Sequence, residues 1–470
     1  MQADLTDRVR TSGPSGPQPP RSVWRMHVIA CPDPKWRGAI LTLTKNGPFC
    51  DGAQIGRTAD GPSALRIDDS TLSRRHVRFD LAADDVLWLT DLGSSNGTYV
   101  NGERCDRAEL GHNTILRLGA NVFLLERDTG SRPECADPTV DIPGRSERAR
   151  QLRGALEDAA QDTAPVLLQG DTGTGKEHAA HELHERSGRK GKLVRLNVTA
   201  VSESLFEAEL FGHLAGAYTG ALTGRPGRLR EANLGTLVLD EIGELSPFVQ
   251  TKLLRMLEER TVRAVGSAKD EPIDVRFCAS TNADLAARIA DGRFRRDLFA
   301  RFHTHVIQLP SLRERPADLF ALADALLPLR ATADGTAPWA TVLHEETVEA
   351  MLLYPWPDNL RELAATLVRL KRHVGTEPVS RNLLPDTVLK TARGKVALVR
   401  TAELVAVQHD DAVDLPAPPD AAALRLALAE EHGVLENVAR RFGRHRKQVY
   451  RWLEQAGIDE AELSWYRSAR

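Results

Sequence analysis

The chain has few cysteines, and no pattern that would put them to use. Its 470 residues include five, an odd number, widely separated and without a CxxC pair: Cys31, Cys50, Cys105, Cys135 and Cys278. This spacing suits a reducing cytoplasm better than a disulfide framework or a cysteine zinc site. The chain also has no run near 18 apolar residues, and its Gly- and Pro-rich start lacks an apolar signal segment. We therefore expect neither a transmembrane helix nor a signal peptide.

An excess of charge of one sign is missing as well. The 62 basic and 65 acidic residues leave a formal charge of −3, so no positive field of the whole chain points to nucleic acid. A sum near zero can still conceal a local cluster.

The first quarter of the chain has the pattern of short strands. Apolar and charged residues alternate from Val77 to Leu81, and Asn-Gly turn signals recur at 46–47, 96–97 and 101–102. Short alternating strands with frequent turns predict a β-sandwich or barrel, which we place at residues 23–128. The Gly- and Pro-rich residues 1–22 are expected to be a disordered tail.

The rest of the chain has a different pattern. Between about 141 and 379, strand-like runs such as Val166–Leu168 and Thr236–Leu239 alternate with helical ones, which predicts a parallel sheet covered by helices. Residues 420–470 have a helical pattern. We expect linkers at 129–140 and 380–419, so that the chain forms three domains, as its length suggests at roughly 150 residues each.

A phosphate-binding loop follows the first of these strands. It has the GxxxxGK pattern and reads Gly170-Asp171-Thr172-Gly173-Thr174-Gly175-Lys176. Glycines let backbone N–H groups surround phosphates, the following helix contributes its dipole, and Lys176 reaches the β- and γ-phosphates. Glu177 stands where Ser or Thr usually supplies a hydroxyl to Mg²⁺. Asp240 and Glu241, at the end of another strand, would hold the Mg²⁺ shell and polarise the attacking water, respectively.

Several further motifs occur in order around this loop, at residues 209–213, 216–221, 239–245, 280–282, 294–298, 312–315 and 356–363. Over about 230 residues the chain resembles the central domain of bacterial enhancer-binding proteins, the AAA+ ATPases that activate sigma-54 RNA polymerase. The resemblance implies an α/β P-loop ATPase at 141–310 with a helical lid at 311–379. It also implies ATP and Mg²⁺ as cofactors, a bacterial cytoplasmic location and assembly from dimer to hexamer. Glu177 is normal in this family.

The resemblance also implies roles for individual residues. Asn197 would couple the state of the nucleotide to Glu241, and Thr281 with Asn282 would form the first sensor. Arg295 and Arg301 resemble arginine fingers that reach the γ-phosphate of the neighbouring subunit, and Arg361 resembles the second sensor. A surface ion pair remains the alternative for the two finger candidates.

One motif carries no catalytic polar group and reads Gly216-Ala217-Tyr218-Thr219-Gly220-Ala221. Its glycines permit a mobile hairpin whose aromatic side chain would be exposed at the tip, as in a partner surface. In the family this loop contacts sigma-54. Tyr218 stands where the family usually has Phe. Because the aromatic ring is kept and only a hydroxyl is added, we expect the contact to survive.

Three motifs in the predicted sandwich, at residues 56–57, 73–76 and 91–102, resemble a forkhead-associated (FHA) domain. The resemblance implies phosphothreonine binding, with Arg57, Ser73 and Arg74 on the phosphate and Ser95 and Asn96 on the peptide backbone. A doubly charged phosphate suits such donors. The alternative is an FHA domain that serves packing or a phosphate-independent contact.

Two other motifs are misleading. Residues 93–97 satisfy G-x-S-x-G, but that motif needs a strand-to-helix turn, and Thr98–Val100 continues as a strand. His181 and His184 resemble the histidines of HExxH with the wrong spacing. We expect solvated helix histidines there, and no zinc site.

The C-terminal stretch contains a basic cluster, with six basic residues and no acidic residue between 440 and 451. Residues 437–453 read as helix, turn and helix and resemble the Fis-type helix-turn-helix of the same activator family. The second helix would enter the major groove of enhancer DNA. The residues expected at bases or phosphates are Arg444, Arg446, Lys447, Gln448 and Arg451. A basic solvated face is the alternative.

Together these patterns predict a sigma-54-dependent transcriptional activator that binds enhancer DNA, forms a ring and hydrolyses ATP to open promoters. Its FHA domain would sense phosphothreonine on a partner protein or on another subunit. The alternatives are a phosphothreonine-binding adaptor with slow or no ATPase activity and a regulator that acts on another sigma factor.

Overall fold

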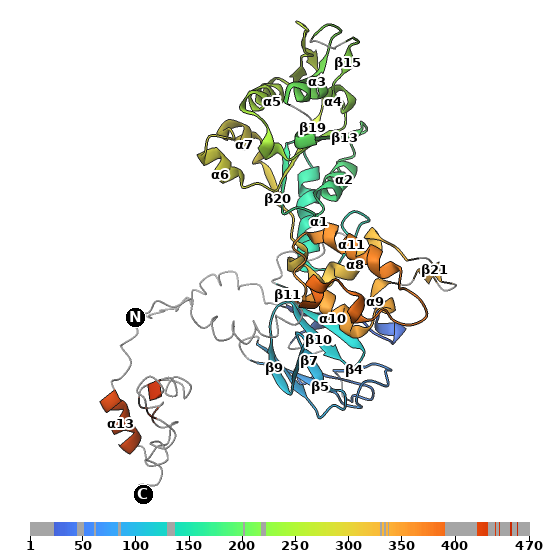
Figure 1. Ribbon diagram of the computed structural model, residues 1–470, viewed down its shortest axis with the longest axis vertical. Coiled ribbons are helices and arrows are strands. Elements are labelled where there is room, and N and C mark those ends of the chain that lie inside the picture. Colours follow the sequence, from blue (N-terminus) through green and yellow to red (C-terminus); the bar gives the residue numbers. More distant parts are fainter. Residues whose placement is uncertain are drawn as a thin grey trace, which may run out of the picture. The chain divides into compact units, whose positions relative to one another are not determined.

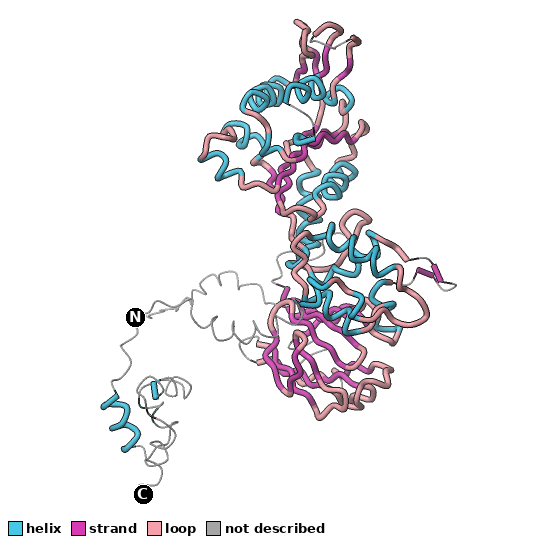
Figure 2. Tube along the Cα trace, in the orientation of Figure 1, coloured by secondary structure: helices cyan, strands magenta, loops and turns pink. Residues whose placement is uncertain are grey.

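The structure is a computed structural model in which the chain divides into two compact units, Met1–Val399 and Arg400–Arg470. It describes residues 23–44, 51–60, 63–82, 86–128, 137–200, 203–217, 222–329, 331–332, 335–336, 338–390 and 421–430, and the single residues 438, 441, 452, 453 and 458. Figures 1 and 2 show the elements of each unit. Within the described residues, no helix combines the length and the apolar character that a membrane span requires.

The first part of the larger unit is a sandwich of two sheets. Their strand orders are β2-β1-β11-β10-β7-β8 and β4-β3-β5-β6-β9. The strands are β1 (Val23–Ala30), β2 (Ile40–Leu43), β3 (Gln54–Gly56), β4 (Ala64–Arg66), β5 (Val77–Leu81), β6 (Leu87–Asp91), β7 (Thr98–Val100), β8 (Glu103–Cys105), β9 (Arg107–Leu110), β10 (Thr114–Leu118) and β11 (Asn121–Asp128). The sandwich predicted from the sequence is confirmed.

The sequence pattern explains this sandwich locally. In β5, Val77 and Phe79 are buried between the sheets while Arg78 is exposed, as the period of two requires. Asn101 and Gly102 have φ of 51° and 86° and join β7 to β8. Two central residues with positive φ are what a type I′ hairpin needs. The predicted turn at 46–47 lies outside the described residues.

The second part of the larger unit is built on a parallel sheet with the order β13-β16-β19-β12-β20. Its strands are β12 (Val166–Gln169), β13 (Leu193–Asn197), β16 (Thr236–Asp240), β19 (Arg276–Thr281) and β20 (His305–Gln308). Separate apolar clusters cover its two faces, which explains why the strands read as continuous apolar runs. The predicted helix-covered parallel sheet is confirmed.

Helices flank this sheet (Figure 1). They are α1 (Glu147–Ala160), α2 (Lys176–Arg186), α3 (Glu203–Phe211), α4 (Arg228–Glu231), α5 (Pro247–Glu259), α6 (Leu285–Ala290) and α7 (Arg296–Phe302). The side chains of Ser146, Ser246 and Asp284 accept backbone N–H groups in the first turns of α1, α5 and α6, which satisfies donors that a helix start leaves open.

Two short hairpins and several 3-10 turns complete this part. The hairpins pair β14 (Gly212–His213) with β15 (Arg225–Pro226) and β17 (Thr261–Val262) with β18 (Glu271–Pro272). The 3-10 turns of the larger unit are η1 (Pro34–Trp36), η2 (Val198–Ala200), η3 (Ile242–Glu244), η4 (Leu312–Glu314), η5 (Pro316–Asp318) and η6 (Arg381–Leu383).

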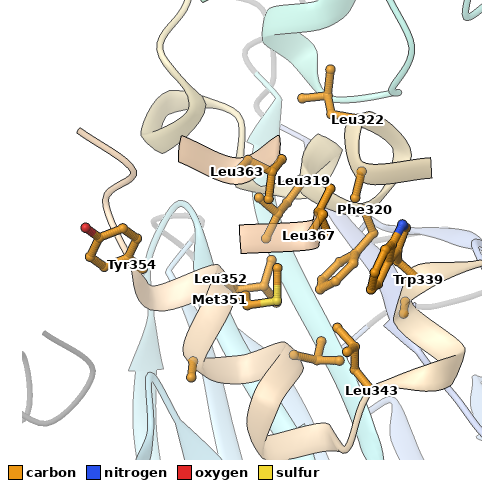
Figure 3. Close-up of a cluster of buried hydrophobic side chains, with 14 of the residues drawn as sticks. Leu319, Phe320, Leu322, Trp339, Leu343, Met351, Leu352, Tyr354, Leu363 and Leu367 are labelled. Atoms are coloured by element: carbon orange, nitrogen blue, oxygen red, sulfur yellow. The ribbon is translucent and has the colours of Figure 1, made fainter. Parts of the chain in front are cut away.

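A helical lid follows the sheet. It contains α8 (Leu319–Leu326), α9 (Trp339–Val342), α10 (Glu345–Leu353) and α11 (Asn359–Lys371), with a short pair β21 (Ala331–Thr332) and β22 (Gly335–Thr336). Side chains from all four helices form one buried cluster (Figure 3). Trp339 is completely buried in it, and its indole N–H donates to the Leu327 carbonyl at 2.8 Å.

The smaller unit is described only in part. Its helix α13 (Ala421–Glu430) buries Leu424, Ala427 and Leu428 in one cluster with Val438 and Leu453. Of the predicted helix-turn-helix at 437–453, only residues 438, 441, 452 and 453 are described. Its five predicted DNA-contacting residues lie outside the described residues.

Candidate functional site

The phosphate-binding loop joins β12 to α2, so it leaves the carboxyl edge of the sheet and enters the N-terminus of a helix. Gly173 and Gly175 have φ of 76° and 99°, which L residues with side chains rarely adopt. The Lys176 ammonium donates to the carbonyls of Gly170 (2.8 Å) and Asp171 (3.1 Å). Burial lowers the pKa of Lys176, and the nearby carboxylates of Glu241 and Asp240 oppose that shift.

The loop is bound directly to the lid. Asn359 at the start of α11 donates from its side chain to the Thr172 carbonyl at 2.9 Å, and the Leu360 N–H donates to the Gly173 carbonyl at 2.9 Å. A Cβ at Gly173 would lie 2.4 Å from the Asp358 carbonyl oxygen. Glycine is therefore needed at 173 for this approach of the lid as well as for its φ.

The two acidic residues stand at the end of β16, which β19 separates from β12 in the sheet. The Ser280 hydroxyl donates to Asp240 Oδ1 at 2.7 Å. Burial raises the pKa of Asp240, and the hydrogen bond from Ser280 works against that shift. Glu241 has φ 58°, in the left-handed region that a residue with a side chain rarely occupies. Strain of this kind is typical of functional sites.

Most of the predicted nucleotide residues line one cavity of about 380 Å³, but Gly170, Asp171, Thr174 and Asn282 are not on its wall. Its lining includes Lys176, Asp240, Glu241 and the lid residue Arg361. The remaining predicted residues on its wall are Thr172, Gly173, Gly175, Glu177 and Asn197. The structure thus brings together residues that are up to 189 positions apart in the sequence, from Thr172 to Arg361.

The sensor and coupling residues differ in their contacts. The Asn282 amide donates to Thr172 Oγ1 at 3.1 Å, and its backbone N–H lies 3.4 Å from Glu241 Oε2. Thr281 is buried, and its hydroxyl accepts from the Ala283 N–H. The Asn197 side-chain oxygen accepts from the N–H and the hydroxyl of Thr199, so its described hydrogen bonds run within its own turn.

Sequence reasoning missed several residues of this site. Ser280 was noted only as part of a motif, and Arg195 and His178 were not noted. Arg195 donates to Glu177 Oε2 at 2.9 Å and also to its carbonyl oxygen, and His178 lines the cavity. A basic residue two positions before Asn197 on the same strand was the available signal for Arg195, because β13 ends beside the loop.

The donor set of the cavity fits Mg²⁺. This ion prefers oxygen ligands, keeps several waters and binds through one or two carboxylates together with substrate phosphates. Asp240 provides such a carboxylate, oriented by Ser280 and close to Lys176. Among the described residues no cluster of three His, Cys, Asp or Glu side chains could enclose a metal on its own.

The two candidate arginine fingers lie apart from the cavity, at the ends of α7. Arg295 pairs with Asp297 at 2.6 Å, and Arg301 pairs with Glu258 at 2.5 Å. Both pairs are about half exposed. Neither arginine lines the nucleotide cavity of its own chain, so a role on a nucleotide would require a neighbouring subunit.

Only the start of the predicted sigma-54 loop is described. Gly216, with φ 81°, and Ala217 follow β14, while residues 218–221 lie outside the described residues. The flanking Leu214 and Leu222 are 48% and 92% exposed. Apolar side chains at both ends of the loop are compatible with a partner surface.

The predicted phosphothreonine residues come together on three loops of the sandwich. The Arg57 N–H donates to the Ser73 carbonyl (3.0 Å), and the Ser95 N–H donates to the Ser73 hydroxyl (3.0 Å). Arg57, Arg74 and Asn96 are exposed. A Cβ at residue 56 would lie 2.4 Å from the Arg74 carbonyl oxygen, which explains the glycine of this motif.

A buried histidine and a partly buried aspartate hold these loops in place. His76 accepts the Ser73 N–H at Nδ1 (3.3 Å), so its Nε2 carries the proton and donates to the Gly97 carbonyl (3.3 Å). Burial lowers the pKa of His76, which favours this neutral form. Asp91 accepts hydrogen bonds from Gly93, Ser94 and Thr98. Burial would raise the pKa of Asp91, but these hydrogen bonds outweigh it and lower the pKa.

The two misleading motifs are also resolved. Thr98–Val100 is strand β7, as expected, so residues 93–97 form no nucleophile elbow. The expectation of solvated histidines is wrong for His184, which is 8% exposed and lies 2.9 Å from Thr236 Oγ1. His181 bonds instead to Asp141 at 2.6 Å. The two rings therefore have different partners.

Comparisons with known proteins agree with this geometry. Residues 142–308 match the family model described as the sigma-54 interaction domain, residues 313–399 match the AAA+ ATPase lid domain, and residues 53–119 match the FHA domain.

Several curated proteins are similar to the chain. Transcriptional regulatory protein ZraR from Salmonella typhimurium is 40% identical over 267 residues, which are 56% of this chain and 60% of that protein. ZraR from Klebsiella oxytoca is 38% identical over 337 residues, covering 71% and 73% of the two chains. The sigma54-dependent transcriptional activator SfnR from Pseudomonas putida is 46% identical over 217 residues, covering 46% and 59%. The chain thus spans only about 60% of the length of the first of these relatives.

Proposed function

The chain belongs to the family of sigma-54-dependent transcriptional regulators, and on that basis we propose that it is an ATP-hydrolysing activator of sigma-54 RNA polymerase. One observation carries this proposal: Lys176, Asp240, Glu241 and Arg361 line the same cavity. A nucleotide-binding module without hydrolysis would not need an acidic pair beside the lysine.

In this proposal each residue of the cavity has a distinct task. The loop N–H groups and Lys176 bind the phosphates, exchanging the Lys176 contacts with loop carbonyls for contacts with phosphate oxygens. Asp240 holds Mg²⁺, through water, and bound Mg²⁺ offsets the charge of the β- and γ-phosphates. Glu241 orients and polarises the attacking water, and Arg361 senses the nucleotide from the lid.

The hydrolysis step is proposed to depend on assembly. Arg295 or Arg301 of one subunit would approach the γ-phosphate held by the next, where an arginine can be worth about 10³–10⁵ in rate. Both arginines are held only by surface ion pairs, which are weak enough to exchange for a new partner. Turnover per subunit should therefore rise with protein concentration as a ring, which we propose to be a hexamer, forms.

Purified full-length protein tests the ATPase. Glu241→Gln should bind ATP but lose turnover by at least about 100-fold, the usual scale for a positioned general base. Glu244→Gln is the matched control, because Glu244 stands one turn away and is paired with Arg288. Equal turnover of the wild type and Lys176→Ala would refute the proposal and would favour an adaptor with no ATPase activity.

The output of the ATPase is proposed to be promoter opening. Residues 216–221 would contact sigma-54, and the C-terminal unit would bind enhancer DNA through the residues at 444–451. Open-complex formation with sigma-54 holoenzyme, ATP and enhancer DNA tests both. Tyr218→Ala should abolish opening while ATP turnover remains, and loss of turnover together with opening would contradict a contact role for the loop.

The sandwich is proposed to bind phosphothreonine through Arg57, Ser73 and Arg74, with Ser95 and Asn96 on the peptide backbone. A phosphothreonine peptide library and its unphosphorylated counterpart, titrated against the full chain, test this role. Arg74→Ala should weaken binding by about 10-fold or more, since charge-assisted hydrogen bonds contribute about 1.5–3 kcal/mol. The neighbouring Arg75, which bonds to Gln54, provides the control Arg75→Ala. Equal affinity for both libraries would defeat the proposal.

A further inference from the structure

The FHA domain has a second contact face, on the sheet that contains β1, β10 and β11. We propose that this face is a docking surface for the chain's own ATPase module. It attaches to the lid and to helix α1 at the same time and thereby restrains movement of the lid relative to the parallel sheet. The proposal deepens the regulation of the ATPase and rests on the proposed function only for its effect on turnover.

The lid side of the contact is apolar with a buried ion pair at its edge. Ala30, Ile115, Val122 and Leu124 of the FHA domain belong to the buried cluster of the lid, in which Figure 3 labels the lid side chains. Arg117 on β10 donates to Glu349 Oε2 on α10 at 2.8 Å, with 13% and 6% of the side chains exposed. A buried pair of this kind is costly to separate.

The α1 side of the contact is polar. Glu126 on β11 is 2% exposed, and its Oε1 accepts the backbone N–H of Glu147, the first residue of α1, at 2.9 Å. Asp128, two residues further on the same strand, accepts from Arg150 at 2.7 Å. Two carboxylates at a helix N-terminus also complement its dipole. Strand β11 therefore contributes to both attachments.

The FHA domain is thus attached to α1 on the sheet side of the connection between sheet and lid, and to α10 on the lid side. That connection is itself held by Asp318, whose carboxylate accepts the N–H of Arg145, the N–H of Ser146 and the Ser146 hydroxyl. A hinge with a second body fixed on both sides cannot turn unless one attachment breaks. The lid supplies Arg361 to the nucleotide cavity and holds the phosphate loop through Asn359, so a restrained lid restrains the site.

The docking surface is separate from the phosphothreonine loops. Arg57, Arg74 and Asn96 are exposed while the docking contacts are in place. Packing and phosphopeptide binding therefore do not compete for the same residues. An FHA domain fixed in this way is coupled to the lid as a rigid body.

A charge exchange across the interface tests the docking surface in the full chain. Arg117→Glu places two carboxylates together and should release the lid. The double variant Arg117→Glu/Glu349→Arg restores an ion pair in which the two charges have exchanged places. Arg78→Glu, an exposed strand position on the other sheet that pairs with Asp80, is the control. Arg150→Ala removes one of the two contacts with α1, and Asp128 keeps its ion pair with Arg25. We therefore expect this variant to fold even if Arg117→Glu does not.

Two measurements read the result. ATP turnover should rise in Arg117→Glu and in Arg150→Ala by about 5- to 150-fold, the range of a typical coupling between sites. Amide hydrogen exchange of α10 and α11 should become faster in both variants. The double variant should return both readouts toward wild type, and Arg78→Glu should leave them unchanged.

The outcomes separate this proposal from the ATPase proposal. Unchanged or lower turnover in both variants, with unchanged exchange in the lid, would overturn the restraint. If the wild type has no turnover above Lys176→Ala, the ATPase proposal fails, and lid exchange in Arg150→Ala still decides the docking surface. Faster exchange then supports the docking surface, and unchanged exchange overturns it.

Discussion

The hydrogen bond from Ser280 to Asp240 makes a prediction about the acid limit of the reaction. Asp240 must be ionised to hold Mg²⁺, and burial already raises its pKa. The Ser280 hydroxyl donates to Asp240 Oδ1 at 2.7 Å and favours the ionised form. In Ser280→Ala that support is lost, so we expect Asp240 to become protonated at higher pH than in the wild type.

The magnitude follows from the type of bond. A hydrogen bond to a charged group contributes about 1.5–3 kcal/mol. At 1.36 kcal/mol per tenfold change, the ionisation equilibrium of Asp240 should shift about 10- to 160-fold toward the protonated form. The acid limb of the profile of kcat/KM for ATP against pH should move upward accordingly, while turnover well above it should change little.

The assay is ATP turnover at fixed Mg²⁺ over about pH 5 to 9, a range that lies above the ordinary titration of an aspartate and in which a raised carboxyl pKa is seen. Ser280→Thr is the control, because it keeps the hydroxyl and should keep the acid limb near that of the wild type. An identical acid limb in Ser280→Ala and the wild type would refute the reasoning. A uniform loss at every pH would mean that Ser280 has a different task.

Three further predictions concern stability and binding. Gly173→Ala should weaken ADP binding and lower the melting temperature more than the control Gly292→Ala. Both positions have φ near 70°, but only at residue 173 would a Cβ lie 2.4 Å from the Asp358 carbonyl oxygen. Equal losses in the two variants would contradict the close approach. Asp318→Ala should lower the free energy of unfolding by about 3 kcal/mol, since it leaves two buried donors of Ser146 and one partly buried donor of Arg145 without their acceptor. Urea unfolding measures this, and a loss below about 1 kcal/mol would be inconsistent with it. Because the pKa of His76 is lowered in the folded protein, this residue is protonated at higher pH in the unfolded chain than in the folded one. The sandwich should therefore lose stability as pH falls below about 6.5. Denaturation at several pH values checks this, and His76→Gln should show a weaker pH dependence.

The nucleotide site could be predicted in large part because its motifs are local. The loop at 170–176 and the pair Asp240 and Glu241 each stand at the end of an apolar strand. In a parallel sheet such ends meet at one edge, so the sequence was enough to place them together. The sandwich was predictable for a similar reason, since the alternation of β5 and the turn at 101–102 depend on residues that are neighbours in the sequence.

The contacts that tune the site could not be predicted in this way. Ser280 and Asp240 are 40 residues apart, and Asn359 and Thr172 are 187 apart. A serine or an asparagine alone does not show which distant group it will reach. His184 was misjudged because its polar character suggested solvent, whereas packing of α2 against the sheet buried it beside Thr236.

The sequence by itself determined the modules and their chemistry, because glycine loops, strand ends and alternating strands follow from neighbouring residues. Only the tertiary structure decided how the modules are joined. The pattern around residues 129–140 indicated only a linker and predicted no contact between the domains that it joins, whereas Arg117 and Glu349, 232 positions apart, form a buried ion pair. Contacts of that range depend on how whole surfaces complement each other in shape and charge, and no local pattern of residues encodes that fit.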